Sequence, residues 1–383
     1  MDIGLYVHIP FCSARCPYCD FTITAVRARP ERAYVEALLS ELGARFAQAP
    51  WRGAIVRSVF FGGGTPSLVD ASLVASVLAQ ARSLAGPRFL PREVTLEANP
   101  EGLAPEKLCA WREAGVDRIS LGAQSFHDRH LAFLGRAHRA VDIHAAVRAA
   151  REAGFANVSL DLIFGMPGQT LDELEEDLDQ ALALHPEHLS CYNLTAEPAT
   201  RFGRELRAGK WTLPGEEVQA RMFTRTGERL EAAGLRRYEI SNFARPGFES
   251  IHNRRYWRRE STLGIGTGAH SFVADSRGGT RWWNVRDHRR YIAAAREGKS
   301  CVEGSERLGP EDARREWVFL RLREVEGLGP REFRETFGRE LDEVFPGVLP
   351  VLIEEGLIDA SGDRLALTDR GRLLSDEVFL RFF

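Results

Sequence analysis

Short apolar runs alternate with segments of helical spacing through the first half of the chain. The apolar runs are continuous and rich in β-branched and aromatic residues, and they occupy residues 5–9, 58–62, 93–99, 118–123, 158–165 and 189–195. Such runs are typical of strands that are buried on both faces of a sheet. Segments with helical spacing separate them, at 31–48, 70–84, 105–114, 139–153 and 171–184. The alternation predicts an α/β fold, and its six units favour a partial (β/α)6 barrel over an open doubly wound sheet.

The alternation ends near residue 196. A helix is expected at 215–233 and a strand at 238–244, and a helical region begins near residue 309. The tail, residues 352–383, is expected to contain a helix, a turn, a strand, a tight turn at 361–363, a second strand and a second helix. This order is winged-helix-like. A packing or partner-contact role is favoured over DNA binding, because this tail mixes acids with its arginines. The expected divisions are a barrel core at 1–235, an extension at 236–305 and a small C-terminal helical or winged-helix-like domain at 306–383.

Composition narrows the class of protein. The 383 residues are 44% hydrophobic and carry a formal net charge of −3, so stable nucleic-acid binding is not expected. No apolar run reaches the roughly 18 to 20 residues of a membrane span, and the first residues lack the pattern of a secretory signal. The sequence therefore predicts a cytoplasmic protein with reduced thiols.

Three cysteines cluster just after the first apolar run. Cys12, Cys16 and Cys19 lie in HIPFCSARCPYCDF with the spacing C-x3-C-x2-C. In a reducing compartment, clustered cysteines indicate a metal site rather than disulfides. Three thiolates would leave one iron of a [4Fe–4S] cluster without a protein ligand, and an open position is typical of a reactive metal site. A zinc site that recruits His8 is the alternative.

This spacing after a first strand resembles the radical S-adenosylmethionine (SAM) superfamily. The resemblance implies that SAM fills the fourth position on the cluster and is the source of a 5′-deoxyadenosyl radical. The glycines of FFGGGTP (60–66) let backbone approach a ligand closely, and the resemblance implies that this loop holds the methionine end of SAM. Polar side chains also stand at successive strand ends, where parallel α/β folds build their sites.

The match is closer to one family of that superfamily. YVHIPFC, FFGGGTPS, LEANPE, RISLGAQSF, LGRAHR and DLIFGMPGQT resemble the HemN/HemW family, which contains oxygen-independent coproporphyrinogen III dehydrogenase and a heme chaperone. The resemblance implies that SAM contacts come from Tyr6, Tyr18, Gly63, Gly64, Thr65 and Glu97, with a second SAM position lined by Gln124, Arg136 and Asp161.

Three features favour the chaperone branch. Phe21 stands where the dehydrogenase has a fourth cysteine, the segment before Cys12 is short, and HNRRYW (252–257) matches the HNxxYW motif of the chaperone branch. The branch implies heme as cargo, heme-accepting respiratory proteins as partners, and a cytoplasmic location with a peripheral position at the inner membrane. It implies no coproporphyrinogen dehydrogenase activity, which stays the enzyme alternative.

The HNxxYW segment lies in a basic, aromatic region. Residues 236–299 contain 14 Lys and Arg against 6 Asp and Glu, together with three tryptophans. Arginines suit the propionates of heme and aromatic rings suit the porphyrin. The motif assigns heme contacts to His252, Asn253, Tyr256 and Trp257.

Other interpretations of this region stay open. His270 and His288 are further candidate iron ligands. His252 and Asn253 could instead brace a loop through hydrogen bonds. A radical SAM enzyme that modifies RNA would use the same basic and aromatic residues. GIGTGAHSF (264–272) is expected to line the site, with close packing on the barrel as its alternative.

Overall fold

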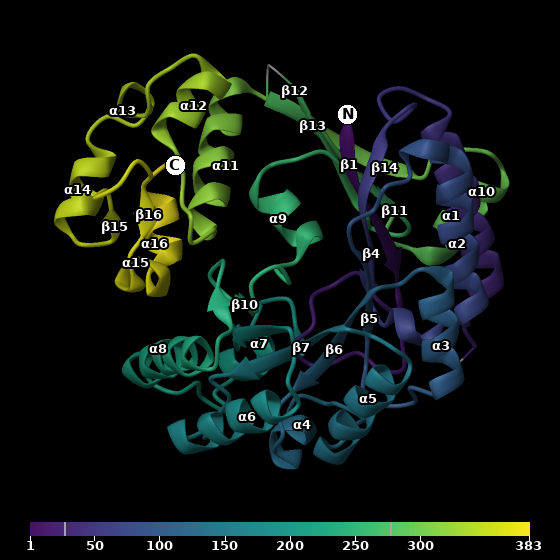
Figure 1. Ribbon diagram of the computed structural model, residues 1–383, viewed down its shortest axis with the longest axis horizontal. Coiled ribbons are helices and arrows are strands. Elements are labelled where there is room, and N and C mark those ends of the chain that lie inside the picture. Colours follow the sequence, from purple (N-terminus) through teal and green to yellow (C-terminus); the bar gives the residue numbers. More distant parts are fainter. Residues whose placement is uncertain (27, 276–277) are drawn as a thin grey trace.

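The computed structural model describes residues 1–26, 28–275 and 278–383. Six parallel strands lie side by side in chain order, and each pairs with the next. They are β1 (Asp2–Ile9), β4 (Ile55–Gly63), β5 (Val94–Ala98), β6 (Arg118–Gln124), β7 (Asn157–Phe164) and β8 (His188–Asn193). The predicted partial (β/α)6 barrel is confirmed, with one strand at each of the six apolar runs (Figure 1).

Helices cover the outer face of this sheet (Figure 1). The covering helices are α1 (Glu31–Phe46), α2 (Ala71–Ala85), α3 (Pro105–Ala114), α5 (Ala140–Glu152) and α6 (Leu171–Ala183). Short elements fill the connections: β2 (Phe11–Cys12), β3 (Thr24–Ala25), the 3-10 turns η1 (Pro66–Leu68) and η2 (Gly86–Arg88), and α4 (Asp128–Phe133). Each of the five helical segments expected between the strands is present.

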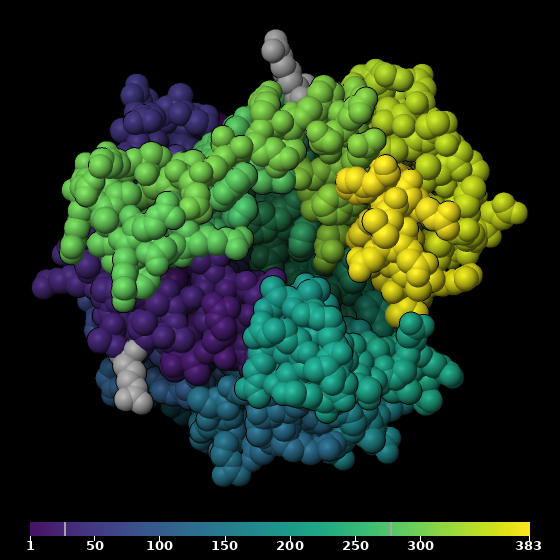
Figure 2. Space-filling model, turned by 180° about the vertical axis from the view of Figure 1, so that it is seen from behind, coloured from purple at the N-terminus to yellow at the C-terminus, as the bar shows by residue number. Residues whose placement is uncertain are grey.

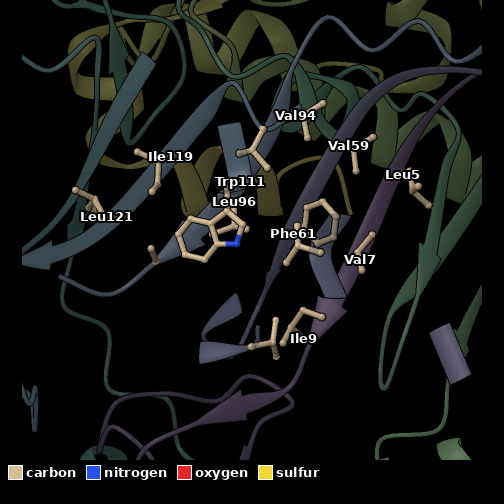
Figure 3. Packing of buried hydrophobic residues seen from close by; sticks show 14 of the residues in the cluster. Leu5, Val7, Ile9, Val59, Phe61, Val94, Leu96, Trp111, Ile119 and Leu121 are labelled. Carbon is tan, nitrogen blue, oxygen red and sulfur yellow. The ribbon is translucent and has the colours of Figure 1, made fainter. Parts of the chain in front are cut away.

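Strand alternation separates the core from the barrel interior. Figure 3 shows Val7, Phe61, Leu96 and Ile119 of four neighbouring strands packed together with Trp111 of α3. These side chains are fully buried. Because successive residues of a strand point to opposite faces, the residues between them point into the barrel. The side chains that point into the barrel include polar ones, so the barrel interior is where a functional site is expected.

Further strands extend the sheet at both edges. At one edge β11 (Thr262–Ile265) pairs in parallel with β1, and antiparallel strands β12 (His270–Asp275), β13 (Gly278–Asn284) and β14 (Val302–Leu308) follow. At the other edge β10 (Asn242–Ala244) and β9 (Arg236–Arg237) follow β8. The segment expected as an extension thus continues the barrel sheet at both edges. Four helices accompany these strands: α7 (Arg201–Arg207), α8 (Glu216–Ala232), α9 (Ile251–Trp257) and α10 (His288–Arg296).

The C-terminal region has a hydrophobic core of its own, with Trp317, Phe333 and Leu352 among its members. Its elements are α11 (Pro310–Arg323), α12 (Pro330–Phe337), α13 (Leu341–Val344), α14 (Val348–Glu354), β15 (Ile358–Asp359), β16 (Ala366–Leu367), α15 (Asp369–Leu373) and α16 (Ser375–Leu380). The hairpin of β15 and β16 encloses the expected tight turn. The order of elements is the winged-helix-like one that the sequence predicts.

Helix α9 stands between the barrel and the C-terminal domain and contacts both β4 and α11 (Figure 1). Figure 2 shows a hollow at the centre of one face, ringed by the purple N-terminal segment, a teal segment, the green extension and the yellow C-terminus. In the described part of the chain, no helix combines the length and the apolar character that crossing a bilayer requires.

Candidate functional site

One cavity of about 410 Å³ gathers the cysteine loop and the carboxyl ends of the barrel strands. Most of the residues predicted for the cluster and SAM line it: Cys12, Cys16, Tyr18, Cys19, Gly63, Gly64, Thr65, Glu97, Gln124, Arg136 and Asp161. Parallel strands end at one edge of a sheet, so residues far apart in sequence meet there. Phe21 also lines the cavity and is 66% exposed.

The sequence interpretation missed several residues that line this cavity. Asn99 and Glu101 belong to the LEANPE motif, and Tyr192 and Asn193 end the sixth parallel strand. Their position at strand ends was the signal available for predicting them. Tyr6, by contrast, is not among the lining residues. Its hydroxyl donates to His8 Nδ1 at 3.1 Å. Burial, with a contribution from Glu97 of the cavity wall, raises the pKa of Tyr6.

The three predicted cluster ligands are free, half-buried thiols. Thr65 Oγ1 donates to Cys12 Sγ at 3.6 Å, and Arg136 Nη1 donates to Cys16 Sγ at 3.8 Å. Burial raises the pKa of Cys12 to about 11 and also raises the pKa of Cys19. A positively charged group in the cavity is therefore needed to hold these residues as thiolates, and bound metal ions have that effect.

The cysteine arrangement fits a cluster better than a zinc ion. Within the described residues, no three His, Cys, Asp or Glu side chains are placed to hold one metal ion. Zinc needs its ligands around a single ion, whereas cysteines bound to a [4Fe–4S] cluster can each take a different iron. His8 Nε2 donates to Thr22 O at 2.7 Å, and Nδ1 accepts from Tyr6, so His8 offers no free nitrogen for zinc.

The glycine turn after β4 locks the cysteine loop in place. Gly63 has φ +112°, and a Cβ on it would lie 2.4 Å from the His8 ring. A Cβ on Gly64 would lie 2.7 Å from the Pro10 and Phe11 carbonyls. Gly64 N donates to Ile9 O at 2.8 Å, which ties the turn to the end of β1. Glycine is required at both positions because no side chain fits there.

Two carboxyl groups face each other across the barrel interior. Burial, with a contribution from Asp161, raises the pKa of Glu97 to about 8. Glu97 Oε2 accepts from Gly63 N at 3.2 Å. Burial also raises the pKa of Asp161, which accepts from Ser120 Oγ at 3.3 Å. A bound cation would let Glu97 ionise at neutral pH, so the pair suits a positively charged ligand.

Arg136 adds a fixed positive charge beside Cys16. Its Nη2 donates to Asn99 Oδ1 at 2.6 Å and to Gly122 O at 3.2 Å. Its Nε is buried and has no partner among the described residues. Gln124, at the end of β6, has φ +68°, a backbone conformation uncommon outside glycine that clusters at functional sites. The free Nε and the strained strand end both suit a bound ligand.

The HNxxYW motif forms helix α9 at the opposite end of the barrel. His252 is 1% exposed, and its ring stacks on Phe60 with centroids 5.1 Å apart. Its Nδ1 lies 2.9 Å from Ser58 Oγ, and its Nε2 lies 3.0 Å from Tyr256 Oη. Burial lowers the pKa of His252 to about 3, so the ring is neutral. Both ring nitrogens are therefore already bonded within the protein.

The rest of the motif faces other neighbours. Asn253 N donates to Ser250 Oγ at 3.3 Å, which caps α9. The Arg323 guanidinium lies 4.5 Å from the centroid of the Trp257 ring. None of the four motif residues lines the cysteine cavity. The motif residues thus stay outside the cysteine cavity, although the ring of Tyr6, a predicted SAM contact, lies 6.3 Å from the His252 ring between centroids.

The remaining candidates lie on the extension. His270 is exposed, and its ring stacks on Trp283 with centroids 5.8 Å apart. His288 lines a different cavity, between α1 and α10. The GIGTGAHSF loop does not line the cysteine cavity, contrary to expectation. Gly266 N donates to Glu41 Oε2 at 3.0 Å, so the loop packs on α1 and its glycines allow that close approach.

Two family models match the chain. The model of the radical SAM superfamily matches residues 6–181, and the model of the HemN C-terminal domain matches residues 308–374. The parallel barrel, the cysteine triplet and the first match together define a radical SAM protein. This superfamily implies a [4Fe–4S] cluster and SAM as cofactors.

Known relatives match from end to end. Heme chaperone HemW of Bacillus subtilis is 40% identical, with 98% of each chain covered. Heme chaperone HemW of Mycobacterium tuberculosis is 39% identical over 98% of this chain and 93% of its own. Heme chaperone HemW of Escherichia coli is 34% identical over 99% of this chain and 98% of its own. The chain therefore belongs to the HemW family.

A solved structure shares the fold. Coproporphyrinogen III oxidase (HemN) from Escherichia coli superposes with a TM-score of 0.84, covering 99% of this chain and 89% of that chain. The two sequences are 24% identical, so this likeness shows the fold alone.

Proposed function

We propose that this chain is a heme chaperone that carries a [4Fe–4S] cluster and SAM, binds heme and delivers it to acceptor proteins. The end-to-end similarity to relatives named heme chaperone HemW carries the proposal. Respiratory proteins at the inner membrane are the proposed acceptors, reached from the cytoplasm. The cysteine cavity supports the cofactors, and the HNxxYW motif of α9 supports the chaperone branch.

Cys12, Cys16 and Cys19 are the proposed cluster ligands. Gly63, Gly64, Thr65, Glu97 and Tyr18 would hold SAM on the cluster, while Gln124, Arg136 and Asp161 would line a second SAM position. Their common cavity supports this assignment. Tyr6 would act as a positioning residue, through its hydrogen bond to His8.

When bound, the cluster and SAM supply an electron and a source of the adenosyl radical. The chain's own residues bind and orient SAM. Glu97 keeps its proton until a cation approaches, because burial raises its pKa to about 8. It can therefore donate a hydrogen bond while protonated, and form an ion pair after losing its proton.

The motif residues His252, Asn253, Tyr256 and Trp257 stay a prediction as heme contacts. The bonds of His252 to Ser58 and Tyr256 count against a ligand role in this conformation. An iron ligand role would require His252 to release one of these partners. Weaker heme binding by a folded His252→Ala variant would support that role.

An anaerobic titration of the cluster-reconstituted protein with heme tests the proposal. Saturable binding near one heme per chain, read from the Soret band, is expected. Transfer of that heme to an apo-cytochrome would complete the chaperone assay. A wild-type protein that binds no heme saturably would overturn the proposal.

The second candidate is the coproporphyrinogen III dehydrogenase reaction, to which the match of residues 308–374 with the HemN C-terminal domain model points. Phe21 argues against it, since a 66% exposed phenylalanine stands at the position of the dehydrogenase's fourth cysteine. The same reconstituted protein, given reductant, SAM and coproporphyrinogen III, is expected to release no decarboxylated product by mass spectrometry.

A further inference from the structure

A second cavity of about 460 Å³ lies on the outside of the barrel, between the start of α1 and helix α10. One wall is apolar and includes Val26, Pro30 and Ala33. The other wall is α10, which contributes His288 and Ile292. Figure 2 shows the light-green segment that contains α10 resting against the purple N-terminal segment. We call this cavity the α1–α10 groove.

His288 combines burial with one uncommitted ring nitrogen. The residue is 9% exposed, and Nδ1 lies 3.3 Å from Thr24 Oγ1. The edge of its ring meets Phe11, with centroids 6.4 Å apart. No hydrogen bond joins Nε2 to any residue of 1–26, 28–275 or 278–383, and this atom is not among the buried atoms that lack a partner. A histidine that ligates a metal through one nitrogen typically has the other held by a hydrogen bond.

Helix α10 carries the other groups that a heme needs. His288, Ile292 and Arg296 are spaced i, i+4 and i+8, so they follow one face of the helix. Arg289 and Arg296 line the groove and are exposed. Neither forms an ion pair within the described part of the chain, whereas neighbouring Arg290 pairs with Glu303 at 3.0 Å. Uncommitted guanidinium groups beside an apolar cavity suit an apolar ligand with carboxylate groups.

We propose that the α1–α10 groove is a heme site, in which His288 Nε2 binds the iron and Arg289 and Arg296 pair with the propionates. The apolar wall at Val26 and Ala33 would cover one part of the porphyrin. This assignment rests on the proposed heme function and deepens it. It places the iron ligand outside the HNxxYW motif, in which both nitrogens of His252 are bonded.

The groove is connected to the cysteine loop. Thr24 belongs to β3, which pairs with β2 in the register Phe11 to Thr24 and Cys12 to Ala25. Phe11 also contacts His288. The hydrogen-bond partner of the proposed iron ligand therefore lies on the strand beside a predicted cluster ligand. Heme in the groove would therefore lie beside the segment that carries the predicted cluster ligands.

The test is an anaerobic heme titration, read by the Soret band, of the cluster-reconstituted protein and four variants: His288→Ala, His252→Ala, Thr24→Val and a control. His288→Ala is expected to lose the wild-type Soret position, and added imidazole is expected to restore it. Thr24→Val removes the hydrogen bond to Nδ1 with little change of shape, and should weaken heme binding by about tenfold. His144→Ala is the matched control, a histidine of α5 that lies outside the groove and bonds to Gln180, and should leave the titration unchanged.

The outcomes separate this site from the function itself. No saturable heme binding by the wild type would overturn the proposed function and this site with it. Normal binding by His288→Ala, with loss in His252→Ala, would overturn the groove and support the motif. If His288→Ala does not fold, as judged by circular dichroism, heme binding by Thr24→Val tests the groove instead. Unchanged binding by that variant would then overturn the site.

Charge reversal tests the propionate contacts with a matched ligand. Arg289→Glu and Arg296→Glu, both at exposed positions, should each weaken heme binding by up to about fivefold, the scale of an exposed ion pair. Heme dimethyl ester lacks the carboxylates, so its affinity should be equal in wild type and variants. An equal loss for both ligands would overturn the arginine assignment. An unchanged affinity for heme in the double variant would overturn it as well.

Discussion

In the cysteine loop, residues 12–19, the thiols line a cavity with few protein partners, whereas the imidazole and the arginines at helix α9 are bonded within the protein. Among the described residues, Arg255 Nε and Trp257 Nε1 are the buried nitrogens of α9 without a partner. His252 bonds to Ser58 and Tyr256. Arg254 and Arg258 both reach Glu324, a carboxylate that is 1% exposed. Both segments carry a strong sequence motif. The difference teaches that a sequence motif fixes only the residue types. Polar atoms that face a cavity without protein partners indicate a ligand site, whereas polar atoms already bonded within the protein indicate a structural role as a brace.

The carboxylates of Glu97 and Glu324 differ in the same way, in whether an arginine pairs with them. Glu97 is half-buried at the cysteine cavity, forms no ion pair with any described residue, and has its pKa raised to about 8 by desolvation. Glu324 accepts from Arg254 Nε at 2.6 Å, Arg258 Nε at 3.2 Å and Arg321 Nη1 at 3.4 Å. The first carboxylate costs stability until a ligand arrives, and the second links α9 to the C-terminal domain.

The largest effect is expected in the cysteine loop. Cys16→Ala should abolish the absorbance of the reconstituted [4Fe–4S] cluster, because two thiolates cannot hold a cluster that uses three protein ligands. Cys109→Ala, at an exposed position on α3, is the control and should keep full absorbance. Iron analysis provides the count. Four irons per chain in Cys16→Ala would refute the ligand assignment.

Breaking the brace should cost stability. Glu324→Gln leaves three guanidinium groups without their shared carboxylate, one of them on a side chain only 12% exposed. We expect the free energy of unfolding to fall by about 2 kcal/mol, less than when a buried charge loses its last partner, because the arginines keep Glu326 and Glu332. Urea denaturation followed by tryptophan fluorescence measures it.

The matched control for this change is Glu343→Gln. Glu343 pairs with Arg339 at the surface, with 55% of its side chain exposed. Its loss should change stability by at most about 0.5 kcal/mol. Similar losses in the two variants would show that Glu324 is not a special link.

Much of the barrel could be predicted from sequence because its strands are encoded locally. Each of the six apolar runs forms a strand, and each helical segment between them forms a helix. The partner of β1 at the open edge could not be predicted. Gly4 pairs with Thr262, and a four-residue strand so distant in sequence is selected by tertiary packing rather than by local periodicity.

The site divides in the same way. That the cysteine triplet and the strand-end residues meet at one cavity could be predicted, because parallel strands bring their carboxyl ends together. The state of His252 could not, because it depends on Ser58 and Tyr256 reaching the two ring nitrogens. The groove at His288 could not be predicted from sequence either, since its walls come from segments far apart in the chain.

His252→Phe tests whether helix α9 has a structural or a ligand-binding role, and its expected effect on stability is of intermediate size. Phenylalanine keeps the stack on Phe60 but leaves buried Ser58 without its partner, so we expect a loss of about 2 kcal/mol in the free energy of unfolding. If His252 is a brace, heme affinity stays at the wild-type value. Loss of the Soret shift in a variant that still folds would instead support the motif as the ligand.

The smallest expected effect is a gain in stability, in the variant Glu97→Gln. The unfolded chain ionises this carboxyl near 4.5, while the folded chain keeps the proton up to about 8. Between these values the folded state binds more protons, so its stability falls as pH rises through the window. Glu97→Gln cannot ionise in either state, which should remove this part of the pH dependence.

Solvent in the open cavity screens the charge, so the gain of Glu97→Gln at pH 8.5 should be about 1 kcal/mol in cluster-free protein, with little difference at pH 4.5. Urea midpoints at the two pH values measure the gain, and Glu343→Gln, exposed and paired, should show none. The same variant should bind SAM more weakly when the cluster is present, since an amide cannot supply the negative charge that a cation favours. Stabilisation together with weaker SAM binding would mark Glu97 as a group that is kept for its ligand at the expense of the fold. A variant that is less stable than wild type at pH 8.5 would place Glu97 with Glu324, among the groups that hold the protein together.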